Sequence, residues 1–152
     1  VLVGGLAALL LWGLFAPEPG EYVASQGNAH ITETQMDQFT YNTYPPTSGP
    51  HLGSLARWGV HDEPIPNELQ VHNLEDGGVF VQYDCPDGCP DLVTELAGIV
   101  GRYDEGVILA PYPDMETRIA LTAWQRIDQF DELDGNRIDR FVRAYRGKDH
   151  HR

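Results

Sequence analysis

The chain has 152 residues, enough for one domain with a buried core but too few for two comfortable domains. It is 41% hydrophobic and 22% charged, and its formal net charge is −13. Such an acidic protein repels nucleic acid, and nucleophile motifs, phosphate loops, dinucleotide fingerprints and paired zinc spacings are missing from the sequence. We therefore expect a protein that is not an enzyme and has no nucleic-acid partner.

The first sixteen residues predict a truncated membrane anchor. The run "VLVGGLAALLLWGLFA" has no charge, and a proline- and glycine-rich stretch follows it. As a helix it would cover about 24 Å, somewhat short of the ~30 Å hydrocarbon layer. A signal peptide and a buried globular helix are the alternatives. The residues expected to pack against neighbouring membrane helices are Gly4, Gly5, Ala7, Ala8 and Trp12.

The charges beside this run predict the side of the membrane. No Lys or Arg precedes Arg57, whereas four acidic residues follow the run between positions 18 and 37. Cytoplasmic flanks favour Lys and Arg, so the globular part should be periplasmic or extracellular. The predicted organisation is a single-pass anchor in the inner membrane (1–16), a linker (17–37), a periplasmic globular domain (38–147) and a basic tail (148–152).

The globular part predicts an α+β domain with a small mixed sheet. Residues 40–67 are rich in proline and glycine but carry many apolar side chains, which predicts an ordered loop over the core. The remaining elements follow in the order strand, helix, strand, strand, helix. The strands are expected at 78–83, 106–112 and 118–127. The first helix is expected at 90–100, beginning at Pro90 and ending before Gly101, and the second helix after a cap at Asp134.

Cys85 and Cys89 lie between the first strand and the first helix of this domain. Their spacing allows a disulfide, and an oxidising compartment would favour one. A helix N-terminus also favours thiolates, so the pair could instead bind metal or act in thiol redox chemistry. Together with His51 and His72, the two cysteines would then supply ligands for copper. Otherwise no cofactor is expected.

Three ordered motifs carry a family resemblance. "YPPTSGPH" (44–51), "WGVHDEPIP" (58–66) and "VHNLEDGG" (71–78) resemble an uncharacterised bacterial family, domain of unknown function 3105. Membership implies an exported or membrane-anchored domain and no established reaction. Asp76 stands where the family motif usually has a second histidine, whereas His51 and His72 match the pattern. A soft-metal site that used that second histidine would be weakened here.

A second resemblance is local. "CPDGCP" (85–90) after a strand is similar to the segment of the thioredoxin-like copper chaperones that assemble cytochrome oxidase. In those proteins two cysteines and a distant histidine bind copper. The resemblance implies a thioredoxin-like topology and supports the copper hypothesis for this chain.

Two functions remain open at this point. The first is a non-catalytic accessory subunit of an energy-converting membrane complex, respiratory or photosynthetic, with lipid and other membrane subunits as partners. The second is a copper-binding or thiol-redox periplasmic protein that uses His51, His72, Cys85 and Cys89.

Overall fold

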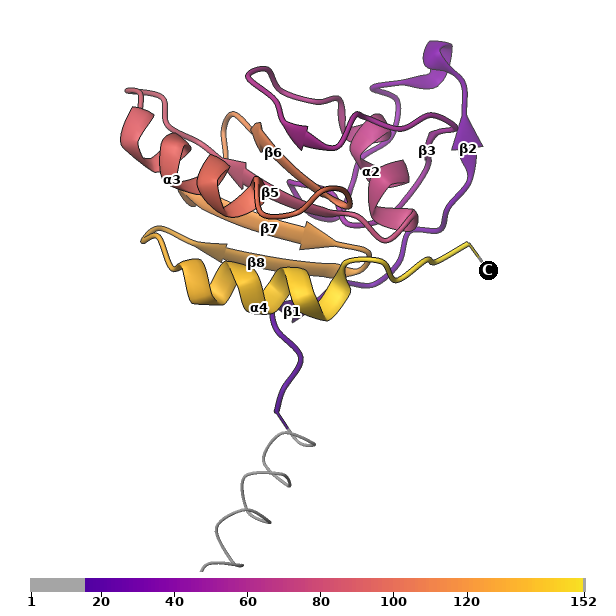
Figure 1. Cartoon of the computed structure of the whole chain (residues 1–152). Coiled ribbons are helices and arrows are strands. Elements are labelled where there is room, and N and C mark those ends of the chain that lie inside the picture. The colour runs from indigo at the N-terminus through magenta and orange to yellow at the C-terminus, as the bar shows by residue number, and fades with distance from the viewer. Residues whose placement is uncertain (1–15, 152) are drawn as a thin grey trace, which may run out of the picture.

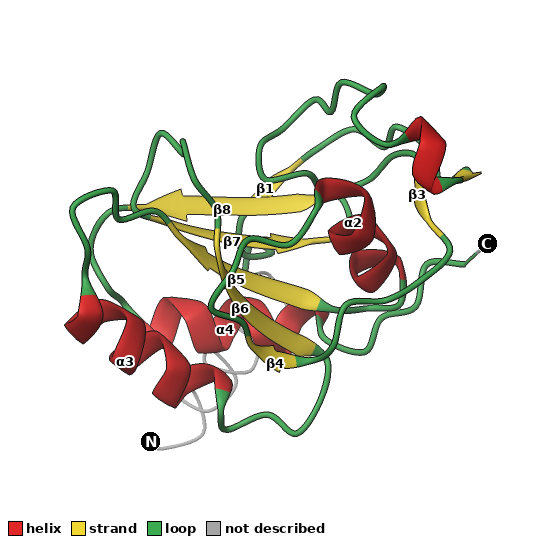
Figure 2. Ribbon diagram, turned by 90° about the horizontal axis from the view of Figure 1, so that it is seen from above, coloured by secondary structure: helices red, strands yellow, loops and turns green. Residues whose placement is uncertain are grey.

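The computed structural model describes residues 16–151, which form a mixed sheet with helices on both of its faces (Figure 1). The elements are β1 (Glu21–Tyr22), β2 (His30–Ile31), the 3-10 helix η1 (Glu33–Gln35), β3 (His51–Leu52), β4 (Gly59–Val60), α2 (Asn67–Glu75), β5 (Val79–Tyr83), α3 (Pro90–Val100), β6 (Val107–Pro111), β7 (Ile119–Ala123), β8 (Arg126–Phe130) and α4 (Gly135–Tyr145). The main sheet has the strand order β1-β8-β7-β5-β6-β4, and β2 and β3 form a second sheet (Figure 2).

Strand β5 lies at the centre of the main sheet. It is parallel to β6 and antiparallel to β7, and α3 makes the connection between β5 and β6. Its side chains alternate between two cores. Val79 and Val81 pack with α3 and α4, whereas Phe80 packs with α2 and the loop of residues 39–65. Because both faces of β5 are covered, the strand is apolar along nearly its whole length.

Two helices begin where the sequence predicts. Helix α3 has Pro90 at its start, where the missing proline N–H is not needed. Helix α4 is capped by Asp134, whose side chain accepts a hydrogen bond from the backbone N–H of Arg137 at 3.0 Å. The buried face of α4 consists of Ile138, Phe141, Val142 and Tyr145, at helical spacing.

The expected fold class, with an N-terminal transmembrane helix, is wrong; the structure is a small mixed α+β domain. Within residues 16–151, none of the helices combines the length and the apolar character needed to cross a bilayer. The segment predicted to be the anchor falls almost entirely on residues 1–15, outside the described part of the chain. The residues expected to pack there, Gly4, Gly5, Ala7, Ala8 and Trp12, lie outside it as well.

The predicted order of elements, on which the expected thioredoxin-like topology depends, also needs correction at two places. The strand expected over 118–127 is a hairpin of β7 and β8, and Gln125 in its turn has a positive φ of 59°. Helix α2 lies in a region that has no helical pattern of apolar residues. Its inward side chains include polar Glu68, Gln70 and Asn73, so apolar residues do not recur at helical spacing.

Candidate metal centre

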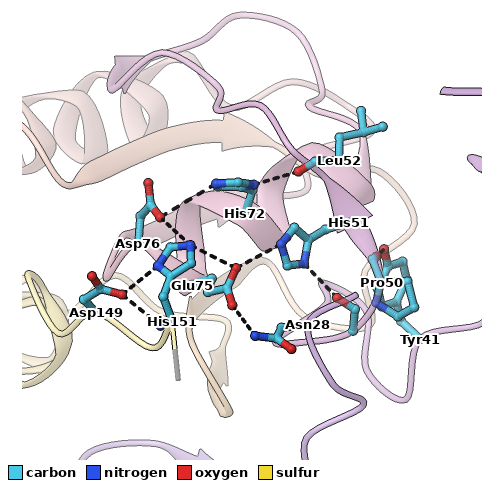
Figure 3. Close-up of polar contacts among 11 residues, drawn as sticks. Asn28, Tyr41, Pro50, His51, Leu52, His72, Glu75, Asp76, Asp149 and His151 are labelled. Atoms are coloured by element: carbon cyan, nitrogen blue, oxygen red, sulfur yellow. Dashed lines mark hydrogen bonds and ion pairs between the residues drawn. The ribbon is translucent and has the colours of Figure 1, made fainter. Parts of the chain in front are cut away.

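Four histidines meet beside the C-terminal end of α2, near the start of β5 (Figure 3 shows three of them). They are His30 in β2, His51 in β3, His72 in α2 and His151 in the C-terminal tail, and we call them the histidine cluster. Glu75, which is 1% exposed, lies among them. The ring centroids of His30, His51 and His72 are 5.0 to 5.2 Å apart.

The small parallel sheet brings the first two histidines together. His30 pairs directly with His51 in the register of β2 and β3, and the His51 N–H donates to the Ala29 carbonyl at 3.0 Å. Gly49, just before β3, has a φ of 123° and lies so close to the rings of Phe39 and Tyr41 that a Cβ would be 3.0 to 3.2 Å from them. The glycine of the "TSGPH" motif is therefore needed for both its backbone and its packing.

The two glycines of "HNLEDGG" allow close packing after α2. A Cβ on Gly77 would lie 2.7 to 2.8 Å from backbone atoms of Lys148, and a Cβ on Gly78 would lie 2.5 Å from the Asn73 carbonyl oxygen. Gly77 also has a φ of 83°. These contacts let the C-terminal tail cross directly over the end of α2.

Backbone and side-chain hydrogen bonds hold the tail in this position. The N–H of Gly147 donates to the Gly77 carbonyl at 2.8 Å, and the N–H of His150 donates to the Glu75 carbonyl at 2.9 Å. Asp149 Oδ1 lies 2.7 Å from His151 Nδ1. His151 Nε2 consequently lies 3.2 Å from Glu75 Oε2 and 3.3 Å from Asp76 Oδ1.

Two imidazoles have their tautomer fixed by backbone carbonyls. His51 Nδ1 lies 2.9 Å from the Gly49 oxygen, and His72 Nδ1 lies 2.7 Å from the Leu52 oxygen. A carbonyl can only accept, so each Nδ1 carries a proton and each neutral ring has a lone pair on Nε2. Metal-binding histidines are oriented by the same kind of outer hydrogen bond.

One buried polar contact in the cluster joins two acceptors when the His51 ring is neutral. His51 Nε2 and Glu75 Oε2 are 3.0 Å apart, both residues are at most 1% exposed, and neither atom has a hydrogen-bond partner among the described residues. The other Glu75 oxygen accepts a hydrogen bond from Asn28 Nδ2 at 2.6 Å (Figure 3). A lone pair facing a carboxylate is repulsive unless a cation lies between them.

Burial and hydrogen bonding act in opposite directions on the pKa values of the cluster. Burial lowers the pKa of His51, and the Gly49 hydrogen bond and Glu75 oppose this only in part. The hydrogen bond with Asp149 raises the pKa of His151, with smaller contributions from Glu75 and Asp76. The interior of the cluster therefore favours a neutral imidazole, and its outer edge favours a charged one.

Two groups of side chains in the described residues could hold a metal ion. One consists of His30, His51 and His72, and the other of His72, Asp76 and His151; the ligand atoms within each group lie within 4.8 Å of one another. Imidazole with carboxylate is a donor set suited to zinc or copper(II). Glu75 belongs to neither group, but its Oε2 lies 3.0 Å from His51 Nε2 and 3.2 Å from His151 Nε2, at the border of both.

The structure brings together only half of the residues predicted to bind copper. His51 and His72 adjoin each other, but Cys85 and Cys89 are joined by a disulfide beyond the opposite end of β5. Five strand residues span roughly 16 Å, so cysteines and histidines do not form one site. Sequence reasoning missed His30 and His151, which are distant in the chain from the motifs and have no motif of their own.

No curated protein and no solved structure matches the chain. Residues 30–152 match the family described as "Protein of unknown function (DUF3105)", and the match includes the loop, α2 and the tail that form the histidine cluster. This confirms the resemblance carried by the three sequence motifs. The chain therefore belongs to the DUF3105 family.

Proposed function

We propose that this protein binds a divalent transition-metal ion at the histidine cluster, and that copper(II) is the ion it binds most tightly. The observation that carries the proposal is the 3.0 Å contact between His51 Nε2 and Glu75 Oε2, two buried atoms that form no hydrogen bond within residues 16–151. The partners of the Glu75 carboxylate in the described residues include Asn28 and the partly exposed His151, whose Nε2 lies 3.2 Å from Oε2. A cation on the buried side would add a counter-charge where burying a carboxylate is costly.

A metal ion at this contact would interact more favourably with the neighbouring imidazoles than a proton would. A proton on His51 Nε2 would form one ion pair with Glu75, but it would not engage His72 Nε2, which lies 3.8 Å from Asp76 Oδ1. It would also place a positive charge against two neighbouring imidazoles, whose ring centroids lie 5.0 and 5.1 Å away. A metal ion is instead stabilised by each neutral imidazole that reaches it.

The donor atoms decide which metals are expected. The cluster offers imidazole nitrogens and carboxylate oxygens but no thiolate, because both cysteines are in the disulfide. Such a donor set suits divalent ions of intermediate hardness, and copper(II) has the highest affinity among the divalent first-row ions. The side chain of His151 is 41% exposed, so the tail supplies the solvent-facing ligand.

Equilibrium dialysis of the full chain against copper(II) and against zinc tests the proposal. The chain should retain one ion per molecule, copper(II) more tightly than zinc. His51→Ala and His72→Ala should each weaken binding at least a hundredfold. His61→Ala is the matched control: this histidine lies outside the cluster, with its Nε2 2.6 Å from the Arg57 carbonyl oxygen, and its loss should change affinity less than twofold.

Circular dichroism separates loss of ligands from loss of fold. Both cluster variants should keep the spectrum of the wild-type chain in the absence of metal. Failure of the wild-type chain to retain a stoichiometric amount of either ion would overturn the proposal. So would equal affinity in wild type and in a correctly folded His51→Ala, His72→Ala double variant.

The role as an accessory subunit of an energy-converting membrane complex stays a prediction, as do the periplasmic location and the membrane-subunit partners. None of the contacts within residues 16–151 is evidence for that role. Its test is the migration of the native protein after mild solubilisation of the membrane, where co-migration with other subunits would support it and migration alone would contradict it.

A further inference from the structure

A second polar site lies at the other end of α2. An open cavity of about 990 Å³ is bordered there by Tyr44, Glu68, Tyr112 and Asp114. Two of the sequence motifs reach it, through the tyrosine that begins "YPPTSGPH" and the last three residues of "WGVHDEPIP", and residues 112–114 border it as well. The metal proposal gives no role to the residues of these segments that border the cavity.

Glu68 is the unusual residue of this cavity. It is only 3% exposed, and one of its carboxylate oxygens accepts a hydrogen bond from the backbone N–H of Asp37 at 2.9 Å. Within residues 16–151, no hydrogen bond or ion pair reaches its other oxygen. The start of α2 offers the carboxylate a favourable dipole, but a buried charge normally also has a counter-charge.

The cavity wall does not supply that counter-charge. Asp37, Asp114 and Glu116 add three further acidic groups, and none of the described lining residues is Lys, Arg or His. The wall therefore concentrates negative potential in a concave space. Such a field attracts cations and repels phosphates, carboxylates and nucleic acids.

Two tyrosines give the cavity an aromatic surface. Tyr112 donates a hydrogen bond from its hydroxyl to Asn67 Oδ1 at 3.0 Å, which fixes its ring beside the start of α2. The Tyr44 hydroxyl accepts from the backbone N–H of Tyr41 at 3.3 Å, and Tyr44 is 49% exposed. Aromatic faces attract ammonium groups, more strongly when both are removed from water.

We infer that this cavity binds a small organic ammonium cation, with its charge against the free oxygen of Glu68 and its carbon atoms against Tyr44 and Tyr112. The combination of one buried carboxylate and two aromatic rings suits a charged group that carries methyl or methylene carbon. A bare metal ion would gain little from contact with the two tyrosine rings. A volume of about 990 Å³ is at the upper end of the range for small-molecule sites. This site is independent of the histidine cluster.

Titration with choline, and with its neutral isostere 3,3-dimethylbutanol, tests the charge requirement. Amide chemical shifts of the full chain should move around Tyr44, Glu68 and Tyr112 with choline, and at least tenfold less at the same concentration of the isostere. Equal responses to the two compounds, or choline shifts confined to other parts of the chain, would overturn the inference. Calcium that displaces choline and binds with higher affinity would overturn it in favour of a hard-cation site.

Two variants test the named contacts. Glu68→Gln keeps an oxygen for the Asp37 N–H but removes the charge, and should weaken choline binding at least tenfold. Glu63→Gln is the matched control, because Glu63 is exposed and does not border the cavity. Tyr112→Phe keeps the ring and should bind choline within about threefold of wild type, whereas Tyr112→Leu should bind several-fold more weakly. Unchanged affinity in Glu68→Gln would contradict the inference.

Discussion

The two ends of strand β5 are built in different ways. Before β5, the histidine cluster and Glu75 come from β2, β3, α2 and the C-terminal tail, so the cluster depends on contacts between segments more than seventy residues apart. After β5, Cys85 and Cys89 meet within one turn, and Cys89 directly precedes α3. The first site needs the folded domain, whereas the second needs only a turn and an oxidant.

This difference separates the two kinds of chemistry along one strand. His51 Nε2 and Glu75 Oε2, before β5, are buried and form no hydrogen bond within residues 16–151, so a bound ion should stabilise the folded state there. The bridge after β5 restricts the unfolded chain and offers no free thiolate to a metal. Metal affinity and disulfide state should therefore be independent properties of this protein.

The largest effect expected from this comparison is that of Glu75→Gln. The glutamine amide nitrogen can donate to His51 Nε2, and its oxygen can still accept from Asn28. The metal-free variant should gain about 1 kcal/mol in free energy of unfolding, because the new buried hydrogen bond to His51 outweighs the lost contact with the partly exposed His151. Copper(II) affinity should fall about a hundredfold, because the amide is a poor ligand. Urea unfolding and equilibrium dialysis measure the two changes.

The opposite signs of these two changes make the test specific. Glu95→Gln, on the exposed face of α3, is the control and should change neither quantity appreciably. A metal-free Glu75→Gln chain that is less stable than wild type would mean that Glu75 already has a proton or another donor as its partner. That result would remove the argument for a cation at this point.

The next largest effect should come from the bridge at the other end of the strand. Cys85→Ser with Cys89→Ser opens a short loop, and loop-closure entropy gives a loss of about 2 kcal/mol in free energy of unfolding. Copper(II) affinity should stay within twofold of the wild-type value. Urea unfolding and dialysis of the double variant measure both, and a tenfold loss of affinity would show that the two ends of β5 are coupled.

The sequence predicted the local features of the fold better than the long-range ones. Pro90 and Asp134 indicate the starts of α3 and α4 because capping depends on a few adjacent residues. Helix α2 could not be predicted from periodicity, because its buried face includes Gln70 and Asn73, whose side chains hydrogen-bond to the backbone of Ile65 and Ala56. Those partners exist only after the loop has folded over the sheet.

The same limit applies to the candidate metal centre. The motifs drew attention to His51 and His72, which lie near glycines that the packing requires. His30 has no such context, and His151 follows a basic stretch that is typical of a solvated tail. Only the parallel pairing of β2 with β3, and the tail hydrogen bonds to Gly77 and Glu75, bring these two histidines to the cluster.

The smallest expected effect is on the titration of tyrosine side chains near the C-terminal end of β6. The titrating groups there are phenols, whereas those of the histidine cluster are imidazoles. Burial raises the pKa of Tyr112 to about 12, and nearby Tyr44 and Glu68 add to the rise although the Asn67 hydrogen bond opposes it. A tyrosine whose pKa is higher in the folded than in the unfolded state contributes stability that is complete below pH 10. This contribution is lost as the pH rises from about 10 to about 12.

Absorbance at 295 nm, followed from pH 9 to pH 13, measures this contribution. Compared with wild type, Tyr112→Phe should lose absorbance change near pH 12 and keep the change near pH 10. Its free energy of unfolding should also fall less steeply with pH between 10 and 12, because the phenylalanine has no proton to lose. If Tyr112→Phe instead lost part of the absorbance change near pH 10, the Tyr112 phenol would be exposed to water in the wild-type protein. In that case its ring would be a weaker partner for an ammonium cation, since the attraction depends on desolvation.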